Sequence, residues 1–128
     1  AKAEKYYNIA LEKDPDYADV IYSLGALYYN EAVRYAKLRA DLPLSAKKEY
    51  TAYTEQFQNY VFKAHPLFVK SEILNPSDRS TIIALKELYA QSGNLEITKE
   101  FKGRLAKLDN GETIEKAFAG HPKTTELF

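Results

Sequence analysis

The sequence contains no cysteine and no methionine, and only five glycines and five prolines among its 128 residues. Without cysteine the chain has no disulfide, no thiolate metal ligand and no cysteine nucleophile. The scarcity of glycine and proline leaves long stretches of alanine, leucine, lysine, glutamate and tyrosine, which favour helix. We therefore predict an all-α protein. The missing initial methionine predicts that the chain is a processed or excised piece of a longer protein.

The charges of the chain are balanced, with 18 basic and 18 acidic residues. No overall positive field is available to attract a phosphate backbone or anionic lipid, so nucleic acid is a poor candidate for a partner. No segment approaches the roughly 20 apolar residues that a membrane-spanning helix needs, and we expect no membrane insertion. Hydrophobic residues make up 45% of the chain, which is typical of a folded domain.

Apolar residues recur at intervals of three or four over most of the chain, which predicts a series of amphipathic helices. In the first helix this stripe consists of Ala3, Tyr7, Ala10 and Leu11. The predicted helices lie before Pro15, over about 17–39, from Ser45 to about 74, between 78 and 92, and near 95–108.

Several residues predict how these helices begin and end. Asp16, with Asp19 as an imperfect capping box, is the expected N-cap of the second helix, and Ser45 that of the third. Gly93 suits a left-handed C-cap. Pro66 predicts a kink or short break in the third helix.

The last 20 residues, 109–128, are predicted to form a tail after the helices. It could contain one short helix over 113–119, ended by Gly120 and Pro122, before fraying. Its order is left open.

Two acid-or-amide–proline steps, Asp14-Pro15 and Asn75-Pro76, bring similar residues into register when the chain is aligned on itself. Their separation is 76 − 15 = 61 residues. The aligned pairs are Ala3 with Ala64, Tyr7 with Phe68, Ala10 with Ser71, Leu11 with Glu72, Ile21 with Ile82, Leu24 with Leu85, Gly25 with Lys86, and Tyr28 with Tyr89.

The segments "AEKYYNIALEKDP" and "VIYSLGALYY" resemble the tetratricopeptide repeat (TPR), and "IIALKELYAQSGN" resembles a degenerate copy. The resemblance implies an α-α superhelix of antiparallel helix hairpins. It divides residues 1–108 into a half repeat (1–15), a repeat with an extended hairpin (16–76) and a regular repeat (77–108). It also implies that Gly25 lies where a neighbouring helix approaches closely, which would offset its low helix propensity.

The spacing of 61 residues exceeds the TPR period of about 34 by about 27. Because the apolar stripe continues on both sides of "DLPLS", we assign the excess to about three added turns on each helix of one hairpin. At ~1.5 Å per residue, some 11 extra residues project its tip by about 16 Å. We expect this hairpin to protrude.

In the TPR family the first helix of each repeat lines a concave groove that binds polypeptide. The positions that the resemblance carries over to this groove are Asp19, Tyr22, Ala26, Tyr29, Asn30, Ser80, Ile83, Glu87, Ala90 and Gln91. This surface is mixed and weakly acidic. It lacks the basic and amide residues with which some members hold a partner's C-terminal carboxylate.

These observations predict a non-catalytic scaffold that binds a protein or peptide through the groove or the protruding hairpin. Eleven tyrosines are present, most of them on the packing stripes. One alternative is self-association through the uncapped first helix, with Tyr7 and Leu11 at the contact. Another is an accessory domain of a larger enzyme. In its long-helix form the chain is similar to bacterial repeat proteins, many of them in the cell envelope.

No pattern of catalytic, cofactor-binding or metal-ligating residues is evident in the sequence. His65 and His121 both precede proline, and neither has a second ligand at metal-binding spacing. We expect them to be surface or packing residues. No glycine-rich phosphate loop or nucleophile elbow appears. We therefore predict no enzyme activity, no cofactor and no metal.

Overall fold

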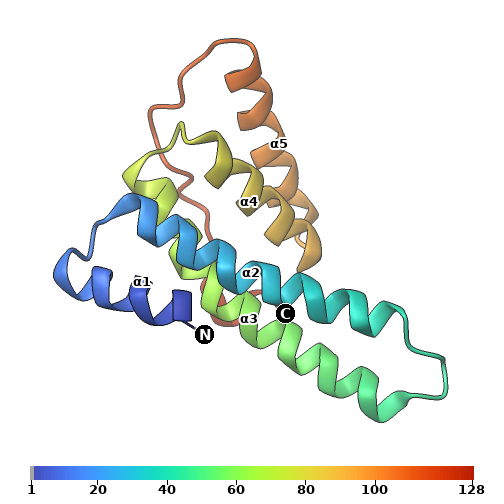
Figure 1. Ribbon diagram of the computed structural model, residues 1–128. Coiled ribbons are helices and arrows are strands. Elements are labelled where there is room, and N and C mark those ends of the chain that lie inside the picture. Colours follow the sequence, from blue (N-terminus) through green and yellow to red (C-terminus); the bar gives the residue numbers. More distant parts are fainter. Residues whose placement is uncertain (1) are drawn as a thin grey trace.

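A computed structural model describes residues 2–128 (Figure 1). Ala1, the first residue of the predicted half repeat, lies outside the described residues. Over these residues the chain is all-α, and its helices pack against one another without any β-strand. The elements are α1 (Lys2–Lys13), α2 (Ala18–Ala40), α3 (Lys47–Leu74), α4 (Arg79–Gln91), α5 (Leu95–Asp109) and the 3-10 helix η1 (Thr124–Glu126). The five predicted α-helices are confirmed, with bounds that differ by one or two residues.

The helices α2 and α3 form a long hairpin, and α4 and α5 form a short one. The first pair has 23 and 28 residues, and the second has 13 and 15, so the long hairpin gains 23 − 13 = 10 and 28 − 15 = 13 residues. In Figure 1 the tip that joins α2 to α3 extends well past the other helices. The predicted protrusion of this hairpin is confirmed.

Gly25 of α2 lies directly against side chains of α3. A Cβ atom built on this glycine would be 2.8 Å from Cε1 of Phe68 and 3.3 Å from Cβ of Leu67. Because real Cβ atoms essentially never come within 3.0 Å of another heavy atom, no larger residue fits here without displacing the Phe68 ring. The expectation that a neighbouring helix requires glycine at position 25 is confirmed.

The core runs along the contacts of α3 with α2 and α4. Residues that align in the sequence are alike in burial, since Ile21 and Ile82 are both buried, as are Leu24 and Leu85. Aromatic rings fill much of the remaining space, with Phe68, Tyr89 and Phe101 each at most 1% exposed. Burial of these apolar surfaces supplies the main driving force for folding.

Two of the predicted helix caps are wrong. The N-cap of α2 is Tyr17 and that of α3 is Ala46, and neither donates or accepts a side-chain capping bond. Asp16 instead forms an ion pair with Nζ of Lys70, 3.1 Å away, and the same amine donates to the carbonyl of Pro15 at 2.7 Å. The turn before α2 is therefore held by α3 rather than by a cap.

Both helices of the short hairpin have side-chain N-caps, and the C-cap predicted at Gly93 is confirmed. Asp78 accepts a hydrogen bond from the backbone N–H of Thr81 at 3.3 Å and caps α4. Gly93 has φ of 82°, and the N–H of Asn94 donates to the carbonyl of Tyr89 at 2.9 Å, which ends α4 in the manner predicted. Asn94 then caps α5.

The break predicted at Pro66 is absent, because α3 is one helix from Lys47 to Leu74. Proline removes one N–H and crowds the preceding turn. Pro66 lies on an exposed part of the helix. Water can reach the carbonyl that proline leaves without a partner there, so the helix continues through this position.

The tail forms no helix over 113–119, so that prediction is wrong. It runs as an irregular extended segment between α3 and α5 and ends in η1, with Leu127 only 6% exposed. Side chains of α3 and α5 form hydrogen bonds with backbone groups of the tail that would be paired with one another in a local helix. Glu72 accepts the N–H of Phe118, and Arg104 donates to the carbonyl of Lys116.

Candidate functional site

The ten positions that the sequence assigns to a groove lie on two helices, α2 and α4. Nine of them retain accessible surface. The tenth, Tyr29, is only 7% exposed, and its ring packs edge-on against Phe68 at a centroid distance of 6.2 Å. Tyr29 is therefore a core residue, and burial, together with the nearby Glu87, raises the pKa of its hydroxyl. The exposed positions are Asp19, Tyr22, Ala26, Asn30, Ser80, Ile83, Glu87, Ala90 and Gln91.

An open cavity of about 340 Å³ lies where the first turn of α2 faces the start of α4. It brings together three of the sequence-predicted groove residues, Asp19, Tyr22 and Ser80, with Asn75 and Asp78 from the turn between α3 and α4. Its lining is acidic and hydroxyl-rich and contains no basic residue. Chemically it offers hydrogen-bond acceptors and an aromatic face to a ligand.

The predicted self-association residues lie at the contact of α1 with α2. Tyr7 and Leu11 are half-buried there, so they are partly covered within the chain. The outer side of the same helix presents Tyr6 and Ile9, which are 62% and 39% exposed. No residue of α1 is fully buried. This helix thus keeps an apolar surface on its open side.

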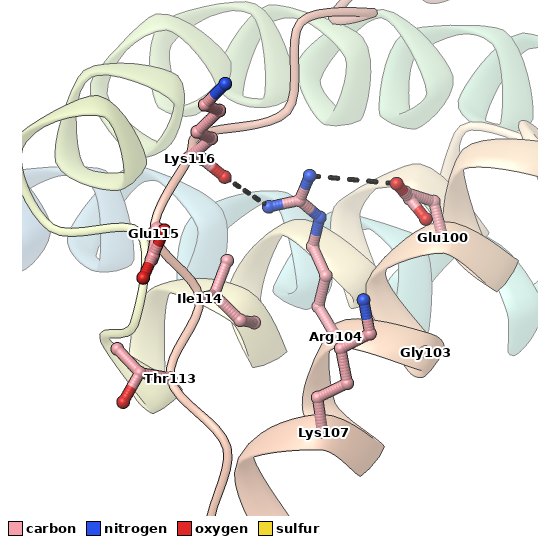
Figure 2. A pocket seen from close by; sticks show the side chains of 8 residues that line it. All are labelled: Glu100, Gly103, Arg104, Lys107, Thr113, Ile114, Glu115 and Lys116. Atoms are coloured by element: carbon pink, nitrogen blue, oxygen red, sulfur yellow. Dashed lines mark hydrogen bonds and ion pairs between the residues drawn. The ribbon is translucent and has the colours of Figure 1, made fainter.

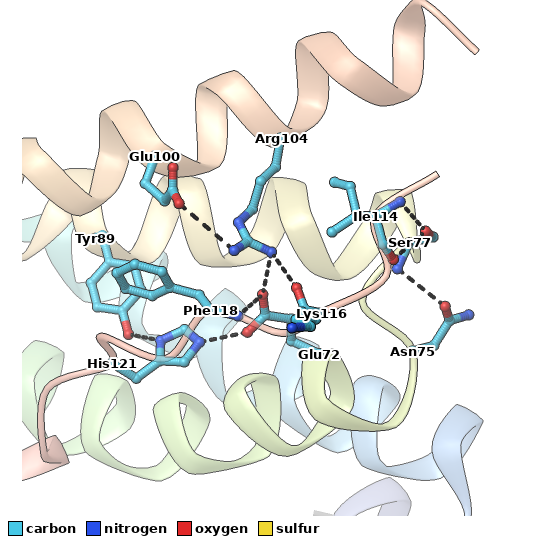
Figure 3. Close-up of polar contacts among 10 residues, drawn as sticks. All are labelled: Glu72, Asn75, Ser77, Tyr89, Glu100, Arg104, Ile114, Lys116, Phe118 and His121. Atoms are coloured by element: carbon cyan, nitrogen blue, oxygen red, sulfur yellow. Dashed lines mark hydrogen bonds and ion pairs between the residues drawn. The ribbon is translucent and has the colours of Figure 1, made fainter. Parts of the chain in front are cut away.

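The structure also contains a buried polar cluster that the sequence analysis missed (Figure 3). Its centre is Glu72 on α3, which is fully buried. Oε1 of Glu72 is 2.6 Å from Nε2 of His121, while Oε2 accepts the N–H of Phe118 at 3.1 Å and lies 3.5 Å from Nη1 of Arg104. A buried carboxylate on a helix is thus joined to the tail and to α5.

A chain of hydrogen bonds continues from His121 toward the C-terminus. Nδ1 of His121 is 2.5 Å from the hydroxyl of Tyr89, which is 2.8 Å from Nε2 of His65. Nδ1 of His65 is in turn 2.8 Å from Oγ1 of Thr124. With both imidazoles neutral, every donor finds an acceptor when each group donates toward Glu72. The hydrogen-bonded chain from Thr124 to Glu72 is therefore satisfied in one consistent tautomer assignment.

Burial dominates the acid–base properties of this cluster. It lowers the pKa of His65 to about 4, with the neighbouring His121 as a second cause. Burial also raises the pKa of Tyr89, and the negative charge of Glu72 adds to that effect. At neutral pH His65 is an uncharged imidazole and Tyr89 a neutral phenol, as the hydrogen-bonding scheme requires.

A second depression, of about 390 Å³, lies between α5 and the tail (Figure 2). Arg104 is one of the residues that line it. One guanidinium nitrogen donates to the carbonyl of Lys116 at 2.9 Å, and another lies 3.7 Å from the carboxylate of Glu100. The guanidinium also lies 5.6 Å and 5.7 Å from the ring centroids of Phe101 and Phe118. Its charge is already compensated, so this depression offers little to an anionic ligand.

One sequence signal could have revealed the cluster. Glu72 aligns with Leu11 in the sequence, so a carboxylate stands where the alignment predicts an apolar residue. Such a departure indicates either exposure or a specific partner. The partner is His121, whose distance of 49 positions along the chain gave no local pattern to follow.

No family model, curated protein or solved structure matches this chain at a significant level. Within residues 2–128, no three His, Asp or Glu side chains are grouped so that they could hold a metal ion. In the same part of the chain, no helix combines the length and the apolar character that crossing a membrane requires. The class that the structure defines is an all-α protein of packed helices.

Proposed function

We propose that this chain is a non-catalytic helical scaffold of TPR type that binds a polypeptide through the face formed by α2 and α4. The proposal combines the sequence resemblance with the pairing of helices into two hairpins joined by short turns. Stacked hairpins present side chains from rigid elements, so binding needs little ordering of the scaffold. The assignment to the TPR class and to a superhelix is part of this proposal.

The observation that carries the proposal is the convergence of Asp19, Tyr22 and Ser80 on one open cavity. These residues are 61 positions apart at the extremes, and the resemblance selected all three for the groove. An aromatic ring beside carboxylate and hydroxyl groups is the composition of a site where a few anchors supply most of the affinity. Tyr22 is steadied by Phe68, at a ring distance of 5.9 Å.

The charge of this face indicates the kind of partner. Among the exposed groove residues, Asp19 and Glu87 are acidic and none is basic. An extended peptide with lysine or arginine near an apolar anchor complements such a surface, since opposite charges favour encounter and register. The lack of a basic clamp argues against capture of a C-terminal carboxylate.

Panning a random peptide library against the immobilised chain tests the proposal. The control is the same chain with Asp19→Lys, an exposed position whose replacement leaves the core intact. We expect enrichment of basic peptides on the native chain and their loss from the variant. Failure to enrich any peptide, or equal enrichment on both proteins, would contradict binding at this face.

The protruding hairpin is a second candidate surface, supported by its exposed apolar tip. Leu44 is 100% exposed and Tyr50 is 51% exposed, beside a shallow cavity of about 510 Å³. Self-association through α1 is supported by the open side of that helix, which carries Tyr6 and Ile9. Light scattering across a range of concentrations, with Tyr6→Glu as the control variant, distinguishes a dimer formed by α1 from a monomer.

A further inference from the structure

The backbones of α3 and α5 are not in contact over the described residues, and the tail lies between them (Figure 3). The ion pair of Glu72 with Arg104 joins the two helices across this space. Both helices pack on α4, which forms the base of the cleft. In the fold of the long hairpin, by contrast, α2 and α3 touch along their whole length. The space between α3 and α5 is therefore filled by an extended segment rather than by a helix.

The cleft holds the main chain of the tail at three points. Oγ of Ser77 accepts the N–H of Ile114 at 2.8 Å and lies 2.9 Å from its carbonyl oxygen, to which it donates. Arg104 donates to the carbonyl of Lys116 at 2.9 Å, and Glu72 accepts the N–H of Phe118 at 3.1 Å. Bonds to alternate main-chain groups are how proteins bind extended peptides whose side chains vary.

The same cleft makes specific contacts with two side chains of the tail, those of His121 and Phe118. The imidazole of His121 stacks on Tyr89 at a centroid distance of 5.8 Å and lies 5.7 Å from Phe101, while both of its nitrogens are hydrogen-bonded. The ring of Phe118 meets His121 edge-on at 5.1 Å and Phe101 at 5.7 Å. A residue that lacks the two ring nitrogens of histidine would leave Oε1 of Glu72 without its hydrogen bond, and the Tyr89 hydroxyl with His65 as its remaining partner.

A tail that only shielded the helices from water would not need a buried carboxylate such as Glu72 in the cleft. It is fully buried, and two of its three partners, His121 and the N–H of Phe118, belong to the tail. A buried carboxylate costs several kcal/mol of desolvation that its contacts must offset, and apolar residues are often as stable in its place. The carboxylate of Glu72 thus forms specific hydrogen bonds with groups of the tail, as expected of a residue in a peptide-recognition site.

We propose that the cleft between α3 and α5 is a polypeptide-binding site for an extended segment in which histidine follows phenylalanine by three residues. Residues 112–128 occupy it within one chain, and the same segment of a second copy enters it when it is vacated. The turn 110–113 that leads into the tail is exposed throughout, with Gly111 at φ of 82°, and serves as the hinge. This cleft is separate from the cavity at Asp19, so neither proposal depends on the other.

The test begins with the full chain, into which a specific protease site is inserted after Gly111. After folding, the chain is cut there, and a fluorescein-labelled synthetic peptide of residues 112–128 is added. We expect the cut tail to remain bound after dilution to micromolar concentration and to exchange with the labelled peptide, raising its anisotropy to saturation. Failure of the labelled peptide to enter, or loss of helical circular dichroism as the tail leaves, would overturn the proposal.

Two unlabelled peptides then compete for the cleft. A peptide with His121→Ala should compete at least tenfold more weakly than the native peptide, because it lacks the hydrogen bonds of His121 to Oε1 of Glu72 and to the Tyr89 hydroxyl. A peptide with Glu115→Ala, altered at an exposed position, should match the native peptide within twofold. Equal competition by all three would overturn recognition of histidine.

The uncut chain tests entry from a second copy. Its own tail competes with the labelled peptide, so we expect binding to the uncut chain at a higher peptide concentration than to the cut chain. If millimolar peptide enters the cut chain but never the uncut one, exchange between copies is wrong.

Discussion

The ring of Phe68 lies where a side chain at position 25 would begin, with Cε1 only 2.8 Å from the place of a Cβ atom. Phe68 is 1% exposed and packed against Tyr22 and Tyr29, so it has no free space to move into. This contact sets the distance between α2 and α3, the two helices of the protruding hairpin.

We predict that Gly25→Ala destabilises the protein although alanine is the better helix former. The added methyl group overpacks the hairpin at a cost of about 1–3 kcal/mol, against a propensity gain of about 0.5–1 kcal/mol. Urea denaturation followed by circular dichroism measures the change. Gly103→Ala on α5 is the matched control, because nothing lies within 4 Å of its Cβ position and it should stabilise the protein by the propensity gain alone.

Acid should weaken the fold through His65. Because burial lowers the pKa of His65 from 6.5 to about 4, the unfolded chain binds more protons than the folded chain between these values. Stability from this group is fully present above pH 6.5 and is lost as the pH falls toward 4, by about 2–3 kcal/mol.

Unfolding free energies at pH 7 and pH 5, compared between the native chain and His65→Gln, measure that contribution. Glutamine keeps a donor and an acceptor near Tyr89 and Thr124 but does not titrate. The native chain should lose more stability than the variant on acidification. Equal losses would mean that His65 is not held neutral in the folded chain.

Replacing the buried carboxylate should loosen the tail before it unfolds the helices. In Glu72→Gln, one of the two acceptor oxygens and the negative charge beside Arg104 are lost, which costs about 1–3 kcal/mol. Hydrogen exchange resolved by residue compares this variant with the native chain. Exchange should accelerate more at the Phe118 amide than at the amide of Leu85 in the core. Uniform acceleration at both positions would instead mean that tail and helices open together.

The tip of the long hairpin should tolerate substitution. Leu44 is completely exposed, so Leu44→Asp should change the unfolding free energy by less than about 0.5 kcal/mol. Leu85→Ala, at a fully buried position on α4, should cost about 2–5 kcal/mol in the same urea titration. A large loss at Leu44 would mean that the tip packs within the fold and is not available to a partner.

The sequence sufficed for the helices because their signals are local. Periodic apolar residues, the glycine after α4 and the two proline steps each act within a few positions. Even the extended hairpin could be predicted, from the apolar stripe that continues on both sides of its turn. The close approach at Gly25 was expected from the resemblance to the TPR, in which small residues let neighbouring helices approach.

The tail and the buried cluster were out of reach for the opposite reason. Their contacts join residues far apart in the chain, such as Ser77 with Ile114 and Glu72 with His121. A helix over 113–119 was a reasonable local choice, but side chains of α3 and α5 bind its backbone first. The cap predicted at Asp16 failed similarly, because Lys70 of α3 takes its carboxylate.

The central claim is that the face of α2 and α4 binds polypeptide. Its most direct test is the dissociation constant of one enriched basic peptide on four proteins: the native chain, Asp19→Lys on that face, Tyr50→Ala at the hairpin tip, and Tyr6→Glu on α1. We predict at least tenfold weaker binding to the Asp19 variant and unchanged binding to the other two. A loss confined to Tyr50→Ala or Tyr6→Glu, with Asp19→Lys binding as the native chain does, would contradict the claim.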